Sequence, residues 1–396
     1  ELLVAFSCKS RGICPSCNAR RAHDTATHLV ERVLPHVPFR QWTLSFPKRV
    51  RWHLAKDIHL CSNVLVLFMR ALFAFQRRRG RELNLEGQSA AVRFIQRFGS
   101  ALQLNVHFHV LVPEGLFAAP APGTEASAAF LPLPPPTDDE VEALLHTVLR
   151  RVVRLLTRRG LLDDDAFPNN ALQLLQAASL QRRFPFPHDE RPPPRKRRCA
   201  SLDGFSLHAN THVHAHDRRG LELLCRYGAR GPLSLERLQR RDDGRLTYRL
   251  KHPAPDGSTH LVLTPLELLR LLAALVPPPR ANLVHFHGAL APHARLRIAV
   301  VPKPPPPCAP QSSRPPPQTP TPSHDRLPWA ELLRRSFSVD VLTCLKCGGR
   351  RRVLAFLTAP DVVRPILDNL GFPSRALPLA PARAPPQASL SVGLLA

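Results

Sequence analysis

Runs of proline cut this chain into blocks, and they constrain its fold more than any other sequence feature. The sequence has 44 prolines and 18 glycines in 396 residues. The proline share is about twice the usual one. Proline fixes φ and lacks the backbone donor, so neither a helix interior nor a central strand passes through a proline-rich run. Because the prolines cluster, we expect folded blocks joined by proline-rich connectors. Collagen, coiled-coil and disulfide mini-protein architectures are excluded.

The connectors divide the chain into seven segments. We expect a Cys-rich start at 1–22, a first core part at 23–117, a Pro-bounded insertion at 118–200 and a second core part at 201–300. A Pro-rich linker at 301–328, a small Cys-x-x-Cys module at 329–373 and a tail at 374–396 follow. Within the insertion, Thr137 and Glu140 have capping-box spacing, and apolar residues recur behind them with helical period as far as Gly160. Further helices are expected near Leu221–Tyr227 and Pro265–Leu275.

The charge balance points to a polyanionic partner. Lys and Arg number 55 against 30 Asp and Glu, a net charge of +25, with arginine clusters at 77–81, 150–159, 191–198 and 237–241. Such an excess favours nucleic acid first and an anionic membrane surface second. The most apolar run, Leu60–Phe75, is interrupted by polar residues and shorter than a spanning helix needs. We read its basic end, Arg77 to Gly80, as a helix terminus, and we expect no membrane span and a cytoplasmic, nucleoid-associated protein.

Cysteines in Cys-x-x-Cys spacing predict zinc sites in a reduced compartment. Cys14 and Cys17 form one such pair, with Cys8 six residues before it, and Cys344 and Cys347 form another. Tetrahedral Zn²⁺ takes four ligands, commonly from two such pairs. The first site is therefore incomplete in this sequence, which begins at Glu1 in mid-pattern, and we expect an upstream segment to be missing. The second pair is either a zinc knuckle or a vestigial ribbon turn.

The run Asn105–Val112 contains the pair of residues with the most chemical interest. Its β-branched and aromatic content predicts a strand, so His107 and His109 share one face, roughly 6.6–6.8 Å apart along the backbone. Two neutral imidazoles on one strand can bind a single divalent ion. A second triplet, His285 to His287, and a run from His212 to His216 have the same alternation. Spacing alone does not choose between them.

The segment Ile95-Gln96-Arg97-Phe98-Gly99-Ser100-Ala101-Leu102-Gln103-Leu104-Asn105-Val106-His107-Phe108-His109 resembles the signature of bacterial rolling-circle insertion-sequence transposases. These are HUH-type single-strand tyrosine transposases with an N-terminal zinc-binding domain. Further segments agree in order along the chain, namely Phe6–Cys17, Asp203–Asn210, Leu224–Tyr227 and Gly288–Pro292. The resemblance implies an α+β fold: an antiparallel HUH sheet that bears the His pair, with the tyrosine helix packed against it and a helical insertion that interrupts it.

The resemblance also implies a reaction and its residues. A tyrosine cuts one DNA strand and leaves a 5′-phosphotyrosine, with Mg²⁺ or Mn²⁺ at His107 and His109, and the DNA is single-stranded or a hairpin end. The chain has two tyrosines, Tyr227 and Tyr248. Members with two catalytic tyrosines carry them four residues apart on one helix, and here the first position is Leu223. Tyr227 is therefore the expected single nucleophile, and Tyr248 is expected to be an ordinary strand residue.

Two questions stay open from the sequence. Glu114, Gln96 and His208 are alternative third ligands for the divalent ion. The alternatives to the transposase are a non-catalytic zinc-ribbon protein that binds nucleic acid, with incidental His pairs, and a decayed, inactive transposase.

Overall fold

The structure is a computed structural model, and it describes residues 14–120, 127–161, 197–254, 256–277, 281–302, 329–337, 340–344, 346–352, 357 and 359–371. The chain separates into two compact units, Glu1–Val339 and Asp340–Ala396. Each unit is described by itself.

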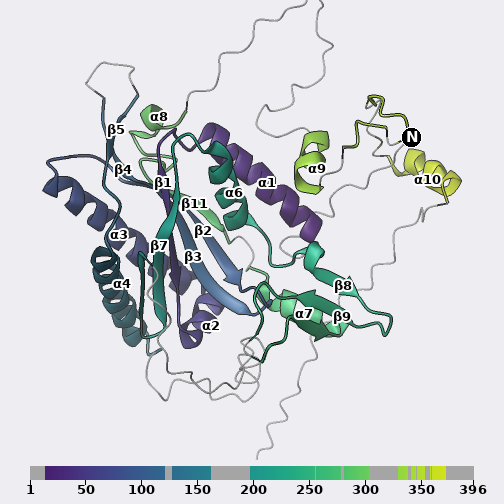
Figure 1. Ribbon diagram of the computed structural model, residues 1–396, viewed down its shortest axis with the longest axis horizontal. Helices are drawn as coiled ribbons and strands as arrows, with labels where there is room; N and C mark the ends of the chain where they lie inside the picture. The colour runs from purple at the N-terminus through teal and green to yellow at the C-terminus, as the bar shows by residue number, and fades with distance from the viewer. Residues whose placement is uncertain are drawn as a thin grey trace, which may run out of the picture. The chain divides into compact units, whose positions relative to one another are not determined.

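A six-stranded antiparallel sheet forms the centre of the first unit (Figure 1). The strand order is β11-β2-β3-β1-β7-β6, and every neighbouring pair is antiparallel. Their bounds are β1 Phe39–Ser45, β2 Ala90–Phe98, β3 Leu104–Pro113, β6 Cys199–Leu202, β7 Phe205–Val213 and β11 Val284–Gly288. The expected α+β fold with a large antiparallel sheet is confirmed.

Three helices cover one face of this sheet. They are α2 Lys48–Lys56, α3 Ile58–Glu82 and α4 Asp138–Arg158. Alternate residues of β3, including Val106, Phe108 and Val110, are fully buried in the same apolar cluster as these helices. Period-two alternation therefore sends the apolar residues of β3 to this side and leaves His107 and His109 on the other.

The opposite face is covered by α1 Pro15–Arg32 and α6 Arg218–Ala229, which pack on one another (Figure 1). A second apolar cluster joins Leu29 of α1, Leu221 and Cys225 of α6, and Phe94 of β2. Asp217 accepts a hydrogen bond from the backbone N–H of Gly220 and caps α6. The expected tyrosine helix is thus present, and it lies on the face that carries the His pair.

The helices α4 and α7 begin with the same N-terminal capping motif. Thr137 and Glu140 form the predicted capping box at α4, and Thr264 forms one with Glu267 at α7, Pro265–Leu275. In each, the side chains satisfy backbone N–H groups that the first turn leaves unpaired. Both helices are where the sequence predicted them.

The expected end of the apolar helix was wrong. We predicted that it ends at Gly80, whereas α3 continues to Glu82 and is capped at Leu83. Gly80 is needed instead for close packing, because a Cβ there would lie 2.5 Å from the Leu116 side chain and 2.8 Å from the Leu85 carbonyl oxygen. By length and composition α3 could cross a membrane. Twelve of its residues are buried inside the protein, however, which is the pattern of a core helix.

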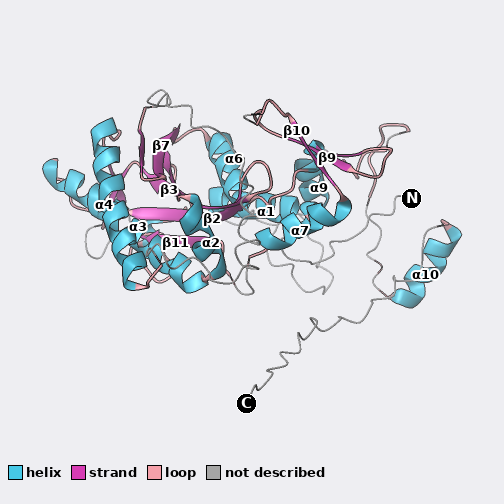
Figure 2. Cartoon of the chain, turned by 90° about the horizontal axis from the view of Figure 1, so that it is seen from below, coloured by secondary structure: helices cyan, strands magenta, loops and turns pink. Residues whose placement is uncertain are grey.

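Smaller elements complete the first unit. A three-stranded sheet with the order β10-β9-β8 (β8 Leu238–Arg240, β9 Leu246–Arg249, β10 His260–Leu263) carries α7, as Figure 2 shows. The hairpin of β4 Gly115–Ala118 and β5 Ala129–Pro132 follows β3. Short α8, Arg297–Val300, follows β11, and α9, Trp329–Phe337, packs against α1.

The described part of the second unit contains a turn and one helix. The turn is closed by an antiparallel bridge between Thr343 and Arg350. The helix, α10, spans Pro360–Asn369.

Candidate active site

The His pair lies in the middle of the sheet, on the face covered by α1 and α6. The ring centroids of His107 and His109 are 4.8 Å apart, and the two side chains are 8 % and 4 % exposed. In the antiparallel register, Gln96 of β2 lies opposite His107, and Thr43 of β1 lies opposite His109. Cross-strand partners project from the same face, so these side chains surround the pair.

One nitrogen of each ring, Nδ1, has a hydrogen-bond partner. The Nδ1 of His107 donates to the backbone carbonyl of Asn105 at 2.7 Å, so its Nε2 carries the lone pair. The Nδ1 of His109 is 3.2 Å from the Thr43 hydroxyl oxygen, and its Nε2 is buried without a hydrogen-bond partner. A partner at one ring nitrogen is the usual way in which a protein orients the other toward a metal ion.

Both rings are uncharged at neutral pH. Burial lowers the pKa of His109 to about 3, with smaller contributions from His107 and Arg230. Burial likewise lowers the pKa of His107, helped by the positive charges of Arg51 and Arg230. Neutral imidazole is the form that binds a metal ion.

Tyr227 meets this pair from the last turns of α6. Its ring lies edge-on to His109, with centroids 5.5 Å apart and an interplanar angle of 89°, and the side chain is 37 % exposed. The Gln96 side-chain amide donates to the backbone carbonyls of Tyr227, at 2.5 Å, and Gly228, at 3.2 Å. Gly228 allows α6 to approach the sheet, because a Cβ there would lie 2.7 Å from the Phe94 ring.

Two cations flank the tyrosine ring. The Arg230 guanidinium lies 4.4 Å from the centroid of Tyr227 and 5.2 Å from that of Phe98, so it is held between two aromatic rings. The Lys251 ammonium lies 5.3 Å from the Tyr227 centroid. A phosphate that reached the tyrosine hydroxyl would therefore meet positive charge from two segments of the chain, one after α6 and one after β9.

The structure separates the three alternative third ligands. Glu114 is excluded, because it follows β3 at the far end, roughly 16–17 Å along the strand from His109, and it binds Arg40 and His212 instead. His208 lies opposite Thr43 on β7, two strands from His109. Gln96 adjoins His107, and its Oε1 is buried without a partner.

Within the described ranges, no three His, Cys, Asp or Glu side chains come together as a metal site. Beside the His pair, the side-chain amide oxygen of Gln96 is a buried oxygen donor of another residue type. Gln96 is one of the three alternative third ligands that the sequence offers without choosing between them. Thr43 and Lys251 are not predicted from the sequence. The strand alternation at 42–45 indicates only weakly that Thr43 faces the His pair, and no local pattern points to Lys251.

The other histidine runs have structural partners. His287 on the edge strand β11 accepts a hydrogen bond from the Arg93 guanidinium at 3.1 Å. The Nε2 of His212 lies within hydrogen-bonding distance of the Glu114 carboxylate, at 2.7 Å. Tyr248 on β9 is 1 % exposed, with the Arg237 guanidinium 4.4 Å from its ring centroid. A buried, covered hydroxyl does not meet a DNA strand, whereas the half-buried Tyr227 can.

The cysteine pairs occupy different settings. Cys14 is the N-cap of α1 and Cys17 is buried in its first turn, while Cys8 lies outside the described residues. In the second unit, hydrogen bonds from the backbone N–H groups of Cys347 and Lys346 lower the pKa of the Cys344 thiol to about 6. The Arg351 guanidinium adds a contact at 3.5 Å.

Two models of known protein families match this chain. A family model described as "Putative transposase" matches residues 90–297, which is more than half of the chain. The chain belongs to this transposase family. A second model, described as "Transposase zinc-binding domain", matches residues 1–46. No curated protein and no solved structure matches the chain.

The two matches confirm the resemblance to rolling-circle insertion-sequence transposases and identify DNA as the partner of this transposase. The first match contains Gln96, His107, His109 and Tyr227, together with both flanking cations. The second contains Cys8, Cys14 and Cys17, and it supports Zn²⁺ as the ion of the N-terminal region.

Proposed function

We propose that this transposase cuts and rejoins a single DNA strand through Tyr227 during rolling-circle transposition. The observation that carries the proposal is the contact between the Tyr227 ring and His109, which brings a partly exposed phenol against one of two adjacent neutral imidazoles. A phenol is a suitable covalent nucleophile for phosphoryl transfer, and in this chain Tyr248 is buried elsewhere.

The residues of the His pair fit a divalent ion. His109 Nε2 and Gln96 Oε1 are buried and unpartnered, and His107 presents its Nε2 from the adjacent position. We assign these three atoms as the ligands of Mg²⁺ or Mn²⁺. Such an ion, when bound, neutralises a phosphate oxygen and orients the phosphorus for in-line displacement.

The chain's own residues perform the remaining steps. The Tyr227 oxygen attacks the phosphorus and loses its proton to solvent, while the bond from phosphorus to the 3′ oxygen breaks and that oxygen takes up a proton from solvent. The products are a 5′-phosphotyrosine and a free 3′-hydroxyl, and attack by a 3′-hydroxyl on this ester reverses the step without another energy source. Arg230 and Lys251 stabilise the negative charge of the phosphate, and Gln96 holds the carbonyl of Tyr227 so that the helix keeps its distance from the metal ligands.

Zinc has a separate, structural role in this proposal. Cys14 and Cys17, with Cys8, supply part of the N-terminal site, and Cys344 and Cys347 form a knuckle that holds half of a second one. A thiol whose pKa is about 6 is largely thiolate at neutral pH, which is the form that binds Zn²⁺.

A gel assay tests the cleavage reaction. Single-stranded oligonucleotides tiled across the DNA that flanks the gene are incubated with the protein and Mn²⁺, and a covalent adduct is detected on a denaturing gel. The double change His107→Ala/His109→Ala should abolish the adduct, whereas His285→Ala/His287→Ala should leave it. Thermal unfolding checks that both variants fold. A non-catalytic binding protein would bind the oligonucleotides but form no adduct, and an adduct that depends only on the second pair would refute the assignment.

A further inference from the structure

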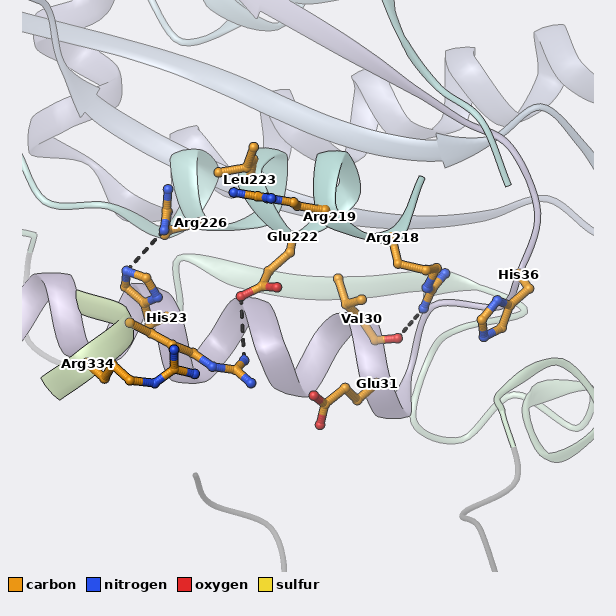
Figure 3. A pocket seen from close by; sticks show the side chains of 11 residues that line it. His23, Val30, Glu31, His36, Arg218, Arg219, Glu222, Leu223, Arg226 and Arg334 are labelled. Carbon is orange, nitrogen blue, oxygen red and sulfur yellow. Dashed lines mark hydrogen bonds and ion pairs between the residues drawn. The ribbon is translucent and has the colours of Figure 1, made fainter. Parts of the chain in front are cut away.

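A basic groove lies between α1, α6 and α9 and encloses a cavity of about 800 Å³ (Figure 3). Five arginines and two glutamates line it, together with two histidines and two aliphatic residues. It is distinct from the His site: Tyr227 turns toward His109 on the sheet, whereas Arg226, one residue earlier on α6, turns toward His23 on α1. Nothing in the cleavage chemistry accounts for this cavity.

Three of the five arginines are engaged within the protein. Arg218 donates to the carbonyl of Val30 in the last turn of α1 and to those of Leu34 and Pro35 beyond it, the latter two at 2.9 and 3.1 Å, and so caps the end of α1. Arg334 and Arg335 both pair with Glu331, and Arg335 also lies 3.9 Å from Glu222. The carboxylates of Glu331 and Glu222 offset the charges of Arg334 and Arg335, and the carbonyl partners hold the Arg218 guanidinium against the end of α1.

Arg219 and Arg226 are different. Neither forms an ion pair with a carboxylate of the described part of the chain. Arg226 donates to His23 Nε2 at 3.2 Å, and His23 is 5 % exposed with its Nδ1 buried and unpartnered. A histidine that accepts this hydrogen bond is neutral, so it orients the guanidinium without cancelling its charge.

The spacing of these two cations matches a nucleic acid strand. They are seven residues apart on α6, which is roughly 10.5 Å along the helix axis, with exposed Leu223 between them. Two cations at this separation can contact phosphates of a flexible single strand. The described lining residues include no Phe, Tyr or Trp, so contacts here read the backbone and not the bases.

We propose that the groove between α1 and α6 holds the phosphate backbone of the DNA strand next to the cut, through Arg219 and Arg226. One wall, α1, belongs to the region matched by the zinc-binding domain, and the other, α6, belongs to the region matched by the transposase model. A strand that contacts both regions runs along this groove and reaches the end of α6 where Tyr227 lies. The inference rests on DNA as the substrate and not on Tyr227 as the nucleophile.

Salt-dependent binding tests the groove. Affinity of the full chain for fluorescent oligothymidylate is measured by anisotropy over a series of salt concentrations, for Arg219→Gln/Arg226→Gln and for the matched control Arg150→Gln/Arg154→Gln. The control removes the same charge from an exposed face of α4, which packs on the other side of the sheet. Loss of two phosphate contacts should make the slope of log affinity against log salt shallower by roughly 1.4 in the groove variant, with several-fold weaker binding at low salt. Equal effects of the two pairs, or none from the groove pair, would overturn the proposal.

Crosslinking locates the strand independently of affinity. A photoreactive p-benzoylphenylalanine replaces Leu223 in the groove or, as control, Val153 on α4, which are 47 % and 37 % exposed. The groove position should crosslink oligothymidylate with a yield several-fold above that of the control, and it should do so equally in a Tyr227→Phe background. A groove yield no higher than the control would exclude the strand from this site, even if Tyr227 is confirmed as the nucleophile.

Discussion

At the scale of single residues, the proposed metal site depends on one buried amide, that of Gln96. Gln96 has two roles in the structure: its NH₂ group holds the last turn of α6, and its Oε1 is left buried beside His107. Gln76 offers a matched comparison, because it is also buried, donates to the Pro113 carbonyl at 3.0 Å and has an unpartnered Oε1. It lies on α3, away from the His pair.

We therefore predict different outcomes for two equivalent truncations. Gln96→Ala removes the proposed metal ligand and should weaken Mn²⁺ binding by roughly tenfold to a hundredfold, which is at least the effect of losing an outer-shell partner. Gln76→Ala removes a comparable buried hydrogen bond and should lower stability only. Titration calorimetry with Mn²⁺, in the absence of DNA, measures the first effect. If both variants bind Mn²⁺ like the wild type, Gln96 is not a ligand.

At the scale of secondary-structure elements, the distance between α6 and β2 determines how closely Tyr227 approaches the His pair on the sheet. Gly228 sets it, because only a residue without Cβ fits against the Phe94 ring. Gly228→Ala should push the helix away, cost about 1–3 kcal/mol of unfolding free energy through overpacking, and reduce adduct formation by Tyr227. The double change Gly228→Ala/Phe94→Leu provides space for the added methyl group and should recover part of both losses. Urea denaturation and the adduct assay check the two effects, and a Gly228→Ala variant with wild-type stability would contradict this packing.

Elements were predictable from the sequence where the signal is local. The alternation around His107 and His109, the capping box at Thr137 and the helix near Leu221–Tyr227 are each indicated by neighbouring residues, and all three are confirmed. The contact between Gln96 and Tyr227 joins segments far apart in the chain, so no spacing rule reveals it. Glu114 was a reasonable ligand candidate by proximity in sequence, yet a straight strand carries it away from His109. Gly80 resembled a helix stop but serves the packing of α3 on Leu116.

At the scale of the whole molecule, buried neutral histidines make stability depend on pH. Burial, together with a nearby arginine in each case, lowers the pKa of His23 and of His287 to about 4. The pKa of His109 is lowered further, to about 3. The unfolded chain takes up protons at these residues below about pH 6.5, whereas the folded chain does not. The stability that these neutral histidines contribute to the folded state is therefore complete above about pH 6.5 and is lost as the pH falls toward their pKa values in the folded state.

We predict that the free energy of unfolding, from urea titrations without divalent ions, decreases steadily between about pH 7 and pH 5. The change His287→Gln keeps an acceptor near Arg93 but cannot titrate, so it should make this decrease shallower. A profile that is flat over this range, or that rises toward acid, would show that these histidines are not buried as neutral groups.

The central claim is that Tyr227 alone forms the covalent bond to DNA, and mass spectrometry of the trapped adduct tests it most directly. The protein is incubated with an oligonucleotide that it cleaves, digested with protease and nuclease, and searched for a peptide that carries a nucleotide. We predict the modification on Tyr227, its loss in Tyr227→Phe with folding and DNA binding nearly unchanged, and its persistence in Tyr248→Phe. A nucleotide on Tyr248 or on a serine, or an undiminished adduct in Tyr227→Phe, would contradict the account.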